Sequence, residues 1–282
     1  MPITICYKFP QEETMKDTLK KGSLILALAG VVILSAGCGG SGAGSASAAS
    51  SGAGRVLKVA TEANDPPYRY VSEKNQIVGF EMDLVKAVAK EMGASVEFKD
   101  MKFSQLLDSV SRKDVDMAIG TLTVNEKRKQ KVDFSDVYFK RSAYTVVVPK
   151  KGHSIRSEND LKGKTVAVKK SSTFETRAKE MGFGKVVPLD HYEDIYKAVA
   201  EGKAEAGISD EQAANYYLAH GGSEKLTVVG TLPGGNNFAI AIAKDNGKLK
   251  DEVNRALKKV MESGTYDELA NKWFSYKAAD RK

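Results

Sequence analysis

The residues best suited to chemistry follow a short apolar run, where the sequence reads DMAIGTLTVNEKRKQKVDFS. The run ends at Gly120, and Thr121 and Thr123 then supply two hydroxyl groups. Arg128 stands a little further on, among lysines. A guanidinium group makes paired, charge-assisted hydrogen bonds with a carboxylate, and such bonds are strong and geometrically selective. This stretch therefore predicts one part of a binding site for a carboxylate.

Two patterns typical of helix starts could add donors to this site. Thr123 stands three positions before Glu126, and Ser172 has the same spacing to Glu175, as in a capping box. The first N–H groups of a helix have no partner within the helix, so they are available to an anion. Both helix starts are therefore candidates for holding the carboxylate.

An acidic residue, Asp210, follows another apolar run, AEAGI (204–208), and also stands at a helix start. Its charge suits an ammonium group, so the combined features predict a free α-amino acid as ligand. Each feature alone has an ordinary alternative. Capping boxes and Asp210 can simply cap helices, and an arginine among lysines is commonly part of a solvated helix face.

Alternating strand and helix patterns must position these residues. Runs rich in β-branched and small apolar residues are expected to be strands at 56–61, 95–99, 115–119, 144–148, 165–168, 204–208 and 238–244. Amphipathic helices between them predict an α/β architecture with largely parallel sheets. In such sheets, ligands bind beyond the carboxyl ends of strands, where Thr121, Lys169 and Asp210 stand.

The N-terminus has the features of an export signal. Lysines precede an apolar core at 24–34, which is too short to span a bilayer and ends in small residues. Cys38 follows these small residues in a way that resembles the lipobox of bacterial lipoproteins. We interpret 1–37 as a signal peptide, with Met15 as an alternative start, and expect lipid on Cys38. A signal peptide followed by an incidental cysteine is the alternative.

A tether is expected to connect this anchor to the folded protein. Residues 38–54 are mainly Gly, Ser and Ala, which cannot bury a core. The folded protein is expected to begin near Arg55, and residues 277–282 to form a C-terminal tail. The lipid would hold the protein on the outer face of the cytoplasmic membrane, at the cell surface or in the periplasm.

Composition and charge exclude several classes of protein. The 43 basic and 36 acidic residues are interspersed along the 282-residue chain, so the net charge of +7 predicts no nucleic-acid partner. The two cysteines, Cys6 and Cys38, both lie in the N-terminal segment and offer neither a disulfide framework nor a metal site. We expect neither a metal nor a cofactor.

Several segments together resemble the family of extracellular solute-binding proteins that supply amino-acid ABC importers. GFEMDLVKAVAKEMG (79–93) is similar to the family's signature, and DMAIGTLTVNEKRKQKVDFSDVYF (116–139) to its most typical segment. The later segments DLKGKTVAVKKSST, GISDEQAA and SGTYDELANKWF also match. The resemblance extends over essentially the whole chain from Arg55 to Phe274.

The resemblance implies an α/β, type II periplasmic-binding-protein-like fold. Two mixed α/β lobes would be joined by two crossover strands, with a ligand cleft between them. Lobe 1 would comprise 55–141 plus 236–276, and lobe 2 would comprise 142–235.

The resemblance also implies how the amino-acid head group is held. Arg128 would bind the ligand carboxylate, helped by the backbone N–H groups of Thr123 and Thr173. The carbonyl of Thr121, the hydroxyl of Thr123 and the carboxylate of Asp210 would bind the ammonium group. The expected ligand-binding residues are, in full, Glu62, Asp65, Tyr68, Phe103, Thr121, Thr123, Arg128, Lys169, Ser172, Thr173 and Asp210.

The residues expected around the ligand side chain favour different amino acids. Phe103 would pack on the side chain, and Glu62 and Asp65 near its tip favour arginine, lysine or ornithine. Lys169 argues instead for an amide or a carboxylate, although an ordinary solvated lysine is an equal alternative. Tyr68 could form a pocket wall, although ordinary packing is its simpler role.

The resemblance therefore implies a monomeric substrate-binding component of an amino-acid ABC importer. It would bind a polar or basic L-amino acid by hinge closure and deliver it to the permease. We favour arginine, lysine or ornithine, followed by glutamine. An amino-acid-sensing extracytoplasmic domain and a dehydratase-like enzyme on the same fold are alternatives. We expect no catalysis, because the sequence has neither HExxH nor GxSxG, and the GKT at Gly163 lacks the preceding glycine of a phosphate loop.

Overall fold

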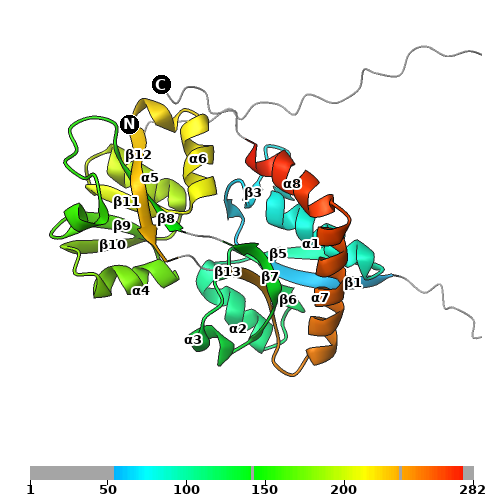
Figure 1. Cartoon of the computed structure of the whole chain (residues 1–282). Coiled ribbons are helices and arrows are strands. Elements are labelled where there is room, and N and C mark those ends of the chain that lie inside the picture. Colours follow the sequence, from blue (N-terminus) through cyan, green and yellow to red (C-terminus); the bar gives the residue numbers. More distant parts are fainter. Residues whose placement is uncertain (1–53, 141–142, 235–236, 276–282) are drawn as a thin grey trace, which may run out of the picture. The chain divides into compact units, whose positions relative to one another are not determined.

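The computed structural model describes residues 54–140, 143–234 and 237–275 (Figure 1). The predictions for the signal peptide, for lipidated Cys38, for the tether up to Ala53 and for the tail at 277–282 lie outside these residues. Within the described part of the chain, no helix combines the length and apolar character needed to cross a membrane.

The first sheet has five strands in the order β5-β1-β6-β13-β7. β1 runs parallel to β5 and β6, whereas β13 runs antiparallel to β6 and β7. The strands are β1 (Arg55–Thr61), β5 (Ala94–Asp100), β6 (Met117–Ala118), β7 (Asp133–Lys140) and β13 (Asn237–Ile242). The accompanying helices are α1 (Phe80–Glu91), the 3-10 helix Phe103–Gln105, α2 (Leu106–Ser111), α3 (Glu126–Lys129), α7 (Gly247–Glu262) and α8 (Thr265–Phe274). With a small sheet of β2 (Asn64–Asp65), β3 (Arg69–Val71) and β4 (Ile77–Val78), they form lobe 1.

The second sheet also has five strands, in the order β10-β9-β11-β8-β12. β9 runs parallel to β10 and β11, and β8 runs antiparallel to β11 and β12. The strands are β8 (Ala143–Pro149), β9 (Thr165–Lys169), β10 (Lys185–Leu189), β11 (Ala206–Ser209) and β12 (Leu226–Pro233). With α4 (Thr173–Glu180), α5 (Tyr192–Ala200), α6 (Glu211–Ala219) and the 3-10 helices Glu158–Leu161 and Gly222–Glu224, they form lobe 2.

The chain passes between the two sheets twice, from β7 to β8 and from β12 to β13 (Figure 1). The returning strand β13 enters lobe 1 antiparallel to its neighbours. The sheets are therefore mixed rather than largely parallel, because strands that cross between lobes do not follow the strand–helix–strand pattern. The predicted two-lobed α/β fold is confirmed.

β1 contributes apolar side chains to a separate layer on each side of the lobe 1 sheet. Leu57 and Val59 pack with apolar residues of α1 and α7, whereas Ala60 packs with Leu106 and Val110 of α2. This alternation follows from the two-residue period of a strand. Burying a leucine or valine side chain stabilises the fold by about 1.5–3 kcal/mol, so both layers hold the strand ends in place.

Candidate functional site

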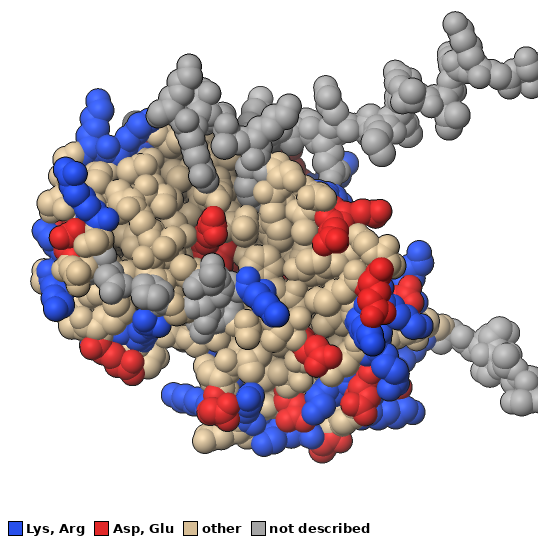
Figure 2. Space-filling model, in the orientation of Figure 1, with Lys and Arg blue, Asp and Glu red and all other residues tan. Residues whose placement is uncertain are grey.

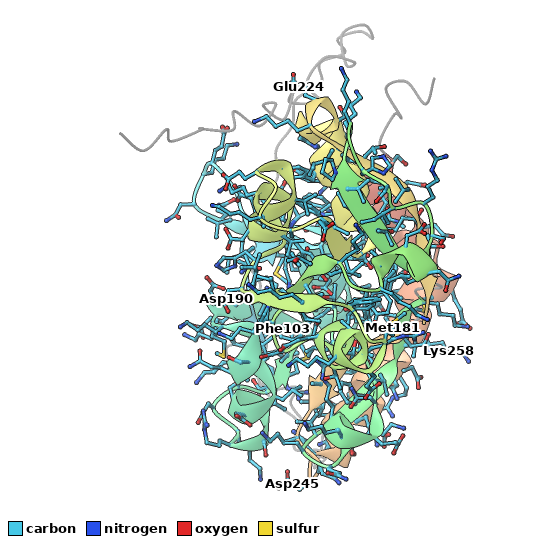
Figure 3. All side chains as sticks on the ribbon, turned by 90° about the vertical axis from the view of Figure 1, so that its left-hand side faces the viewer. Phe103, Met181, Asp190, Glu224, Asp245 and Lys258 are labelled. Atoms are coloured by element: carbon cyan, nitrogen blue, oxygen red, sulfur yellow. The ribbon has the colours of Figure 1, made fainter. Side chains whose placement is uncertain are left out.

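A pocket with about 520 Å³ of space, open solvent included, is lined by residues of both lobes. Most of its walls are strand ends and helix starts, as the sequence predicts. Lobe 1 contributes Arg69, Phe103, Thr121, Thr123, Arg128 and Phe238, and lobe 2 contributes Tyr144, Lys169, Ser172, Thr173, Phe174, Tyr192, Ile208, Ser209 and Asp210. In Figure 3, Phe103 lies at the level of Asp190 and Met181, which belong to lobe 2.

Arg128 brings a partly buried positive charge to the lobe 1 wall. Its Nη1 donates to the Thr123 carbonyl at 2.9 Å, and its guanidinium carbon lies 5.5 Å from the centre of the Phe103 ring. No carboxylate of the described residues forms an ion pair with Arg128. Burial without a counter-charge lowers the pKa of Arg128 to about 10, although Tyr144 acts in the opposite direction. The site therefore has a cation available for an anionic ligand group.

The helix that carries Arg128 begins differently from the prediction. Asn125 caps α3, because its Oδ1 accepts a hydrogen bond from the backbone N–H of Arg128 at 2.8 Å. The predicted capping box of Thr123 and Glu126 is therefore wrong. Instead, Thr123 forms a β-bridge with Phe238 and is almost completely buried in the pocket wall.

The second predicted helix start is confirmed. Ser172 caps α4, and its Oγ accepts a hydrogen bond from the Glu175 N–H at 3.1 Å. Ser172 and Thr173 both line the pocket, and the Thr173 hydroxyl lies 3.1 Å from the Tyr144 hydroxyl. The structure thus brings the start of α4 to the same pocket as Arg128.

Asp210 is buried at the start of α6, and it both caps the helix and lines the pocket. Its Oδ1 accepts from the Gln212 N–H at 2.9 Å and from the Tyr68 hydroxyl at 2.6 Å. Tyr68 belongs to lobe 1 and is outside the pocket lining. It therefore forms no pocket wall, but it contacts the lining residue Asp210. The Tyr68 bond connects the two lobes at Asp210.

Glu62 and Lys169 form a buried ion pair between the lobes. Lys169 Nζ lies 2.6 Å from Glu62 Oε2 and also donates to the Asp190 carbonyl. The other oxygen, Glu62 Oε1, accepts from the Phe103 N–H at 3.1 Å. Lys169 is 5% exposed and lines the pocket, so the alternative of a solvated lysine is wrong.

Asp65, which the sequence places near the ligand side chain, is outside the pocket lining. Its Oδ2 accepts a hydrogen bond from Arg69 Nη1 at 3.2 Å. The same Nη1 lies 3.2 Å from Glu81 Oε2. Burial raises the pKa of Asp65 to about 7, although Arg69 and Lys169 lower it. Burial alone would lower the pKa of Arg69, but Glu81 and Asp65 raise it above its ordinary value. A ligand contact for Asp65 stays a prediction.

Sequence reasoning missed several lining residues. Ser209 directly precedes Asp210 at the end of β11, so the rule on strand ends could have found it. Arg69 gave no such signal, because an isolated arginine in a sequence is usually exposed. The lining residues absent from the expected set are Arg69, Tyr144, Phe174, Tyr192, Ile208, Ser209 and Phe238.

Two further observations limit the chemistry of the pocket. None of the three histidines is among its lining residues, although His191 contacts Asn64 of lobe 1 through its side chain. Across the part of the chain that the structure describes, no group of His, Cys, Asp and Glu residues could hold a metal ion.

Charged side chains of both signs are interspersed on the face shown in Figure 2.

Comparisons with known proteins agree with this geometry. Residues 57–276 match the bacterial extracellular solute-binding proteins, family 3. The arginine-binding extracellular protein ArtP of Bacillus subtilis (strain 168) is 34% identical over 262 residues, which cover 91% of this chain and 99% of ArtP. Two structures of an ancestral arginine-binding protein, bound to arginine and to glutamine, are 37% and 36% identical. Each has a TM-score of 0.73 and matches over 78% of this chain and 98% of its own. The predicted type II periplasmic-binding-protein-like fold is confirmed.

Proposed function

The chain belongs to family 3 of the bacterial extracellular solute-binding proteins, and we propose that it captures a free polar L-amino acid for an ABC importer. The relatives named above bind amino acids, and binding without turnover is the simplest role for a pocket lined by no histidine and no cysteine. The cognate permease would receive the ligand from the loaded protein. Lipid on Cys38 would hold the protein at the outer face of the cytoplasmic membrane.

The observation that carries this proposal is the partly buried guanidinium of Arg128, which forms no ion pair with a carboxylate of the described residues. A desolvated guanidinium without a carboxylate partner is costly, so a ligand carboxylate that pairs with it would stabilise the bound state. Thr123 and the start of α4 at Thr173 lie in the same pocket and would add donors. A ligand carboxylate could therefore bind at this wall.

The opposite end of the head group would bind at Asp210. Asp210 is buried and lines the pocket together with Thr121 from lobe 1. An ammonium group offers three donors, which suits a carboxylate and a threonine carbonyl or hydroxyl. Because Arg128 and Thr121 come from lobe 1 while Thr173 and Asp210 come from lobe 2, the ligand would connect the lobes and favour hinge closure.

The Glu62–Lys169 pair supports a ligand side chain that ends in an amide. An amide carbonyl could accept from Lys169 while the amide NH₂ donates to Glu62, so both charged groups would keep a partner. A cationic side chain would meet the Lys169 ammonium and would compete with it for Glu62. We therefore place glutamine first. This reverses the order expected from the sequence, in which Glu62 and Asp65 favoured a basic amino acid.

Arginine is the second candidate, and a specific observation favours it. The relatives include arginine-binding proteins, and Phe103 offers a ring on which a guanidinium could stack. The ancestral arginine-binding protein was also captured with glutamine, so the two ligands fit one fold. The choice between them depends on whether Lys169 stays at Glu62 or moves away.

Calorimetric titration with L-glutamine, L-arginine, L-lysine and L-ornithine tests this proposal. We expect L-glutamine to bind most tightly, and Lys169→Leu to shift the ratio of affinities toward L-arginine by about tenfold or more, since Glu62 is then available to a guanidinium. Lys170→Leu is the matched control, because the Lys170 side chain, next to Lys169 in the sequence, is 57% exposed and outside the pocket lining. Tighter binding of L-arginine by the unmodified protein would overturn the amide preference. Silence toward every amino acid, from folded protein free of carried-over ligand, would overturn the function.

A further inference from the structure

Glu81 is a fully buried acid that lies outside the pocket lining, within the GFEMDL motif. Its Oε1 accepts hydrogen bonds from the Thr121 N–H, at 2.6 Å, and from the Tyr138 hydroxyl. Its Oε2 accepts from Arg69 Nη1 at 3.2 Å. A side chain that accepts from three donors acts as a carboxylate, which has acceptors only. Glu81 of α1 is therefore hydrogen-bonded to β3, to β7 and to the loop that follows β6.

The backbone around Glu81 fixes its place. The N–H groups of Phe80 and Glu81 donate to the carbonyls of Pro67 and Tyr68, at 3.0 and 2.9 Å. Gly79 permits this close approach, because a Cβ on it would lie 2.3 Å from the Tyr68 carbonyl oxygen. Gly79 also has a φ of 133°, which side chains disfavour. The start of α1 is thus held against the segment that contains Tyr68.

Thr121, the pocket residue bonded to Glu81, has an unusual backbone conformation. Its φ is 48°, in the left-handed region that β-branched residues rarely adopt. Such a conformation persists only where the surroundings enforce it, and it is common at functional sites. The hydrogen bond from the Thr121 N–H to the buried Glu81 carboxylate supplies that enforcement on one side. The preceding residue, Gly120, is closely packed, since a Cβ on it would lie 3.2 Å from Leu106 Cδ1 and 3.4 Å from Arg69 Nε.

We propose that Glu81 is a positioning residue for the amino group of the ligand. Glu81 holds Thr121 in its left-handed conformation at the pocket wall, and its backbone holds Tyr68, whose hydroxyl donates to Asp210. Both groups assigned to the ammonium therefore depend on the start of α1. The contacts of Arg128 are made with Thr123, Asn125 and Phe103 instead, and none of them involves Glu81, so we expect the carboxylate end to respond less to a change at Glu81. This inference rests on the proposed function.

The test compares two ligands that differ only in the amino group. L-glutamine and glutaramic acid, which is glutamine without its α-amino group, are titrated into the full chain and its Glu81→Gln variant. Glu81→Gln replaces one carboxylate oxygen at position 81 with an NH₂ group, which cannot accept a hydrogen bond. Either the Thr121 N–H or Arg69 therefore loses its acceptor. We expect the affinity for L-glutamine to fall about tenfold or more, and that for glutaramic acid to change less than about threefold. Ligand-observed NMR extends the measurement to weak binding. Equal losses for both ligands would mean a purely structural role and would overturn the inference.

Two further variants keep the test decisive. Glu81→Asp retains the charge opposite Arg69 but withdraws the acceptor from Thr121, so it should show the same selective loss if Glu81→Gln does not fold. Tyr138→Phe removes another donor to Glu81 and leaves the Thr121 bond, so both ligands should respond equally. A selective loss in Tyr138→Phe would overturn the assigned route through Thr121.

The unmodified protein separates this inference from the proposed function. If it binds L-arginine rather than L-glutamine, the ligand pair becomes L-arginine and 5-guanidinopentanoic acid, and the same outcomes apply. If it binds no free amino acid, the proposed function fails and the positioning role of Glu81 fails with it. If it binds and both ligands lose affinity equally in Glu81→Gln, only the positioning role fails.

Discussion

Two arginines line the same pocket, but their surroundings differ. Arg69 is 1% exposed and lies within 3.2 Å of carboxylate oxygens of both Asp65 and Glu81. Arg128 is partly buried, and its side chain contacts the Thr123 carbonyl and the Phe103 ring. The pKa of Arg69 is accordingly raised by its two acids, whereas burial lowers that of Arg128 to about 10. The charge of Arg69 is neutralised within the chain, whereas Arg128 forms no ion pair with a carboxylate of the described residues.

The Glu62–Lys169 pair lies between these two cases. Lys169 has a carboxylate partner, as Arg69 does, but that partner comes from the other lobe. It also lines the pocket, as Arg128 does. This pairing therefore depends on how the two lobes meet, and under the proposed function the pair would select the ligand side chain.

The largest effect is expected at Arg69. Arg69→Met keeps an extended side chain but leaves Asp65 and Glu81 buried without their cation. Removing one partner of a buried ion pair typically costs about 3–5 kcal/mol, and we expect a loss of that size in the free energy of unfolding. Urea denaturation of the ligand-free protein measures it.

An exposed arginine provides the control for this prediction. Arg55 pairs with Glu252, but its side chain is 47% exposed, so Arg55→Met should cost less than about 1 kcal/mol. A loss at Arg69 no larger than that at Arg55 would contradict the view that Arg69 neutralises the buried acids.

The next effect concerns the acid beside Arg69 and depends on pH. The pKa of Asp65 is about 7 in the folded chain, above its ordinary value of 3.8. The folded state therefore holds this proton more tightly than the unfolded state, so its contribution to stability is present at pH 4 and is lost as the pH rises through 7. Between pH 4 and 8, the free energy of unfolding of the unmodified protein should fall by on the order of 3 kcal/mol more than that of Asp65→Asn.

Unfolding in urea at several pH values checks this difference. Asp251→Asn is the control, because Asp251 is exposed and should give a profile parallel to that of the unmodified protein. A parallel profile for Asp65→Asn as well would contradict the raised pKa of Asp65 in the folded chain.

How much the sequence could predict differs between these same regions. Arg128, Thr121, Thr123 and Asp210 follow strands or start helices, and local patterns together with the family resemblance brought them to one pocket. Their positions depend mainly on which segments form strands, which apolar periodicity indicates. The cap of α3 at Asn125 was missed, since both Thr123 and Asn125 are good caps and only the backbone conformation decides between them.

The buried charge pairs could not be predicted in this way. Glu62 and Lys169 are 107 positions apart, and their pairing depends on how two lobes meet. Asp65 was expected near the ligand because of its position in the segment that resembles the family, but its carboxylate contacts Arg69, which is buried and also contacts Glu81 of α1. Side-chain partners across elements are set by tertiary packing, which no local pattern encodes.

The smallest expected effect, at Arg128, is the one that completes the comparison. Arg128→Met removes a cation that has no acid to neutralise among the described residues. The free energy of unfolding of the ligand-free variant should therefore equal or exceed that of the unmodified protein, unlike that of Arg69→Met. Ligand affinity should fall by at least ~2 kcal/mol, because the ligand carboxylate would then be buried unpaired. Lys127→Met, an exposed neighbour on α3, should change neither quantity. Calorimetric titration and urea denaturation of the three proteins separate the two roles. If Arg128→Met lost stability as Arg69→Met does and kept its affinity, Arg128 would be a structural cation, and the anion site would have to lie elsewhere in the pocket.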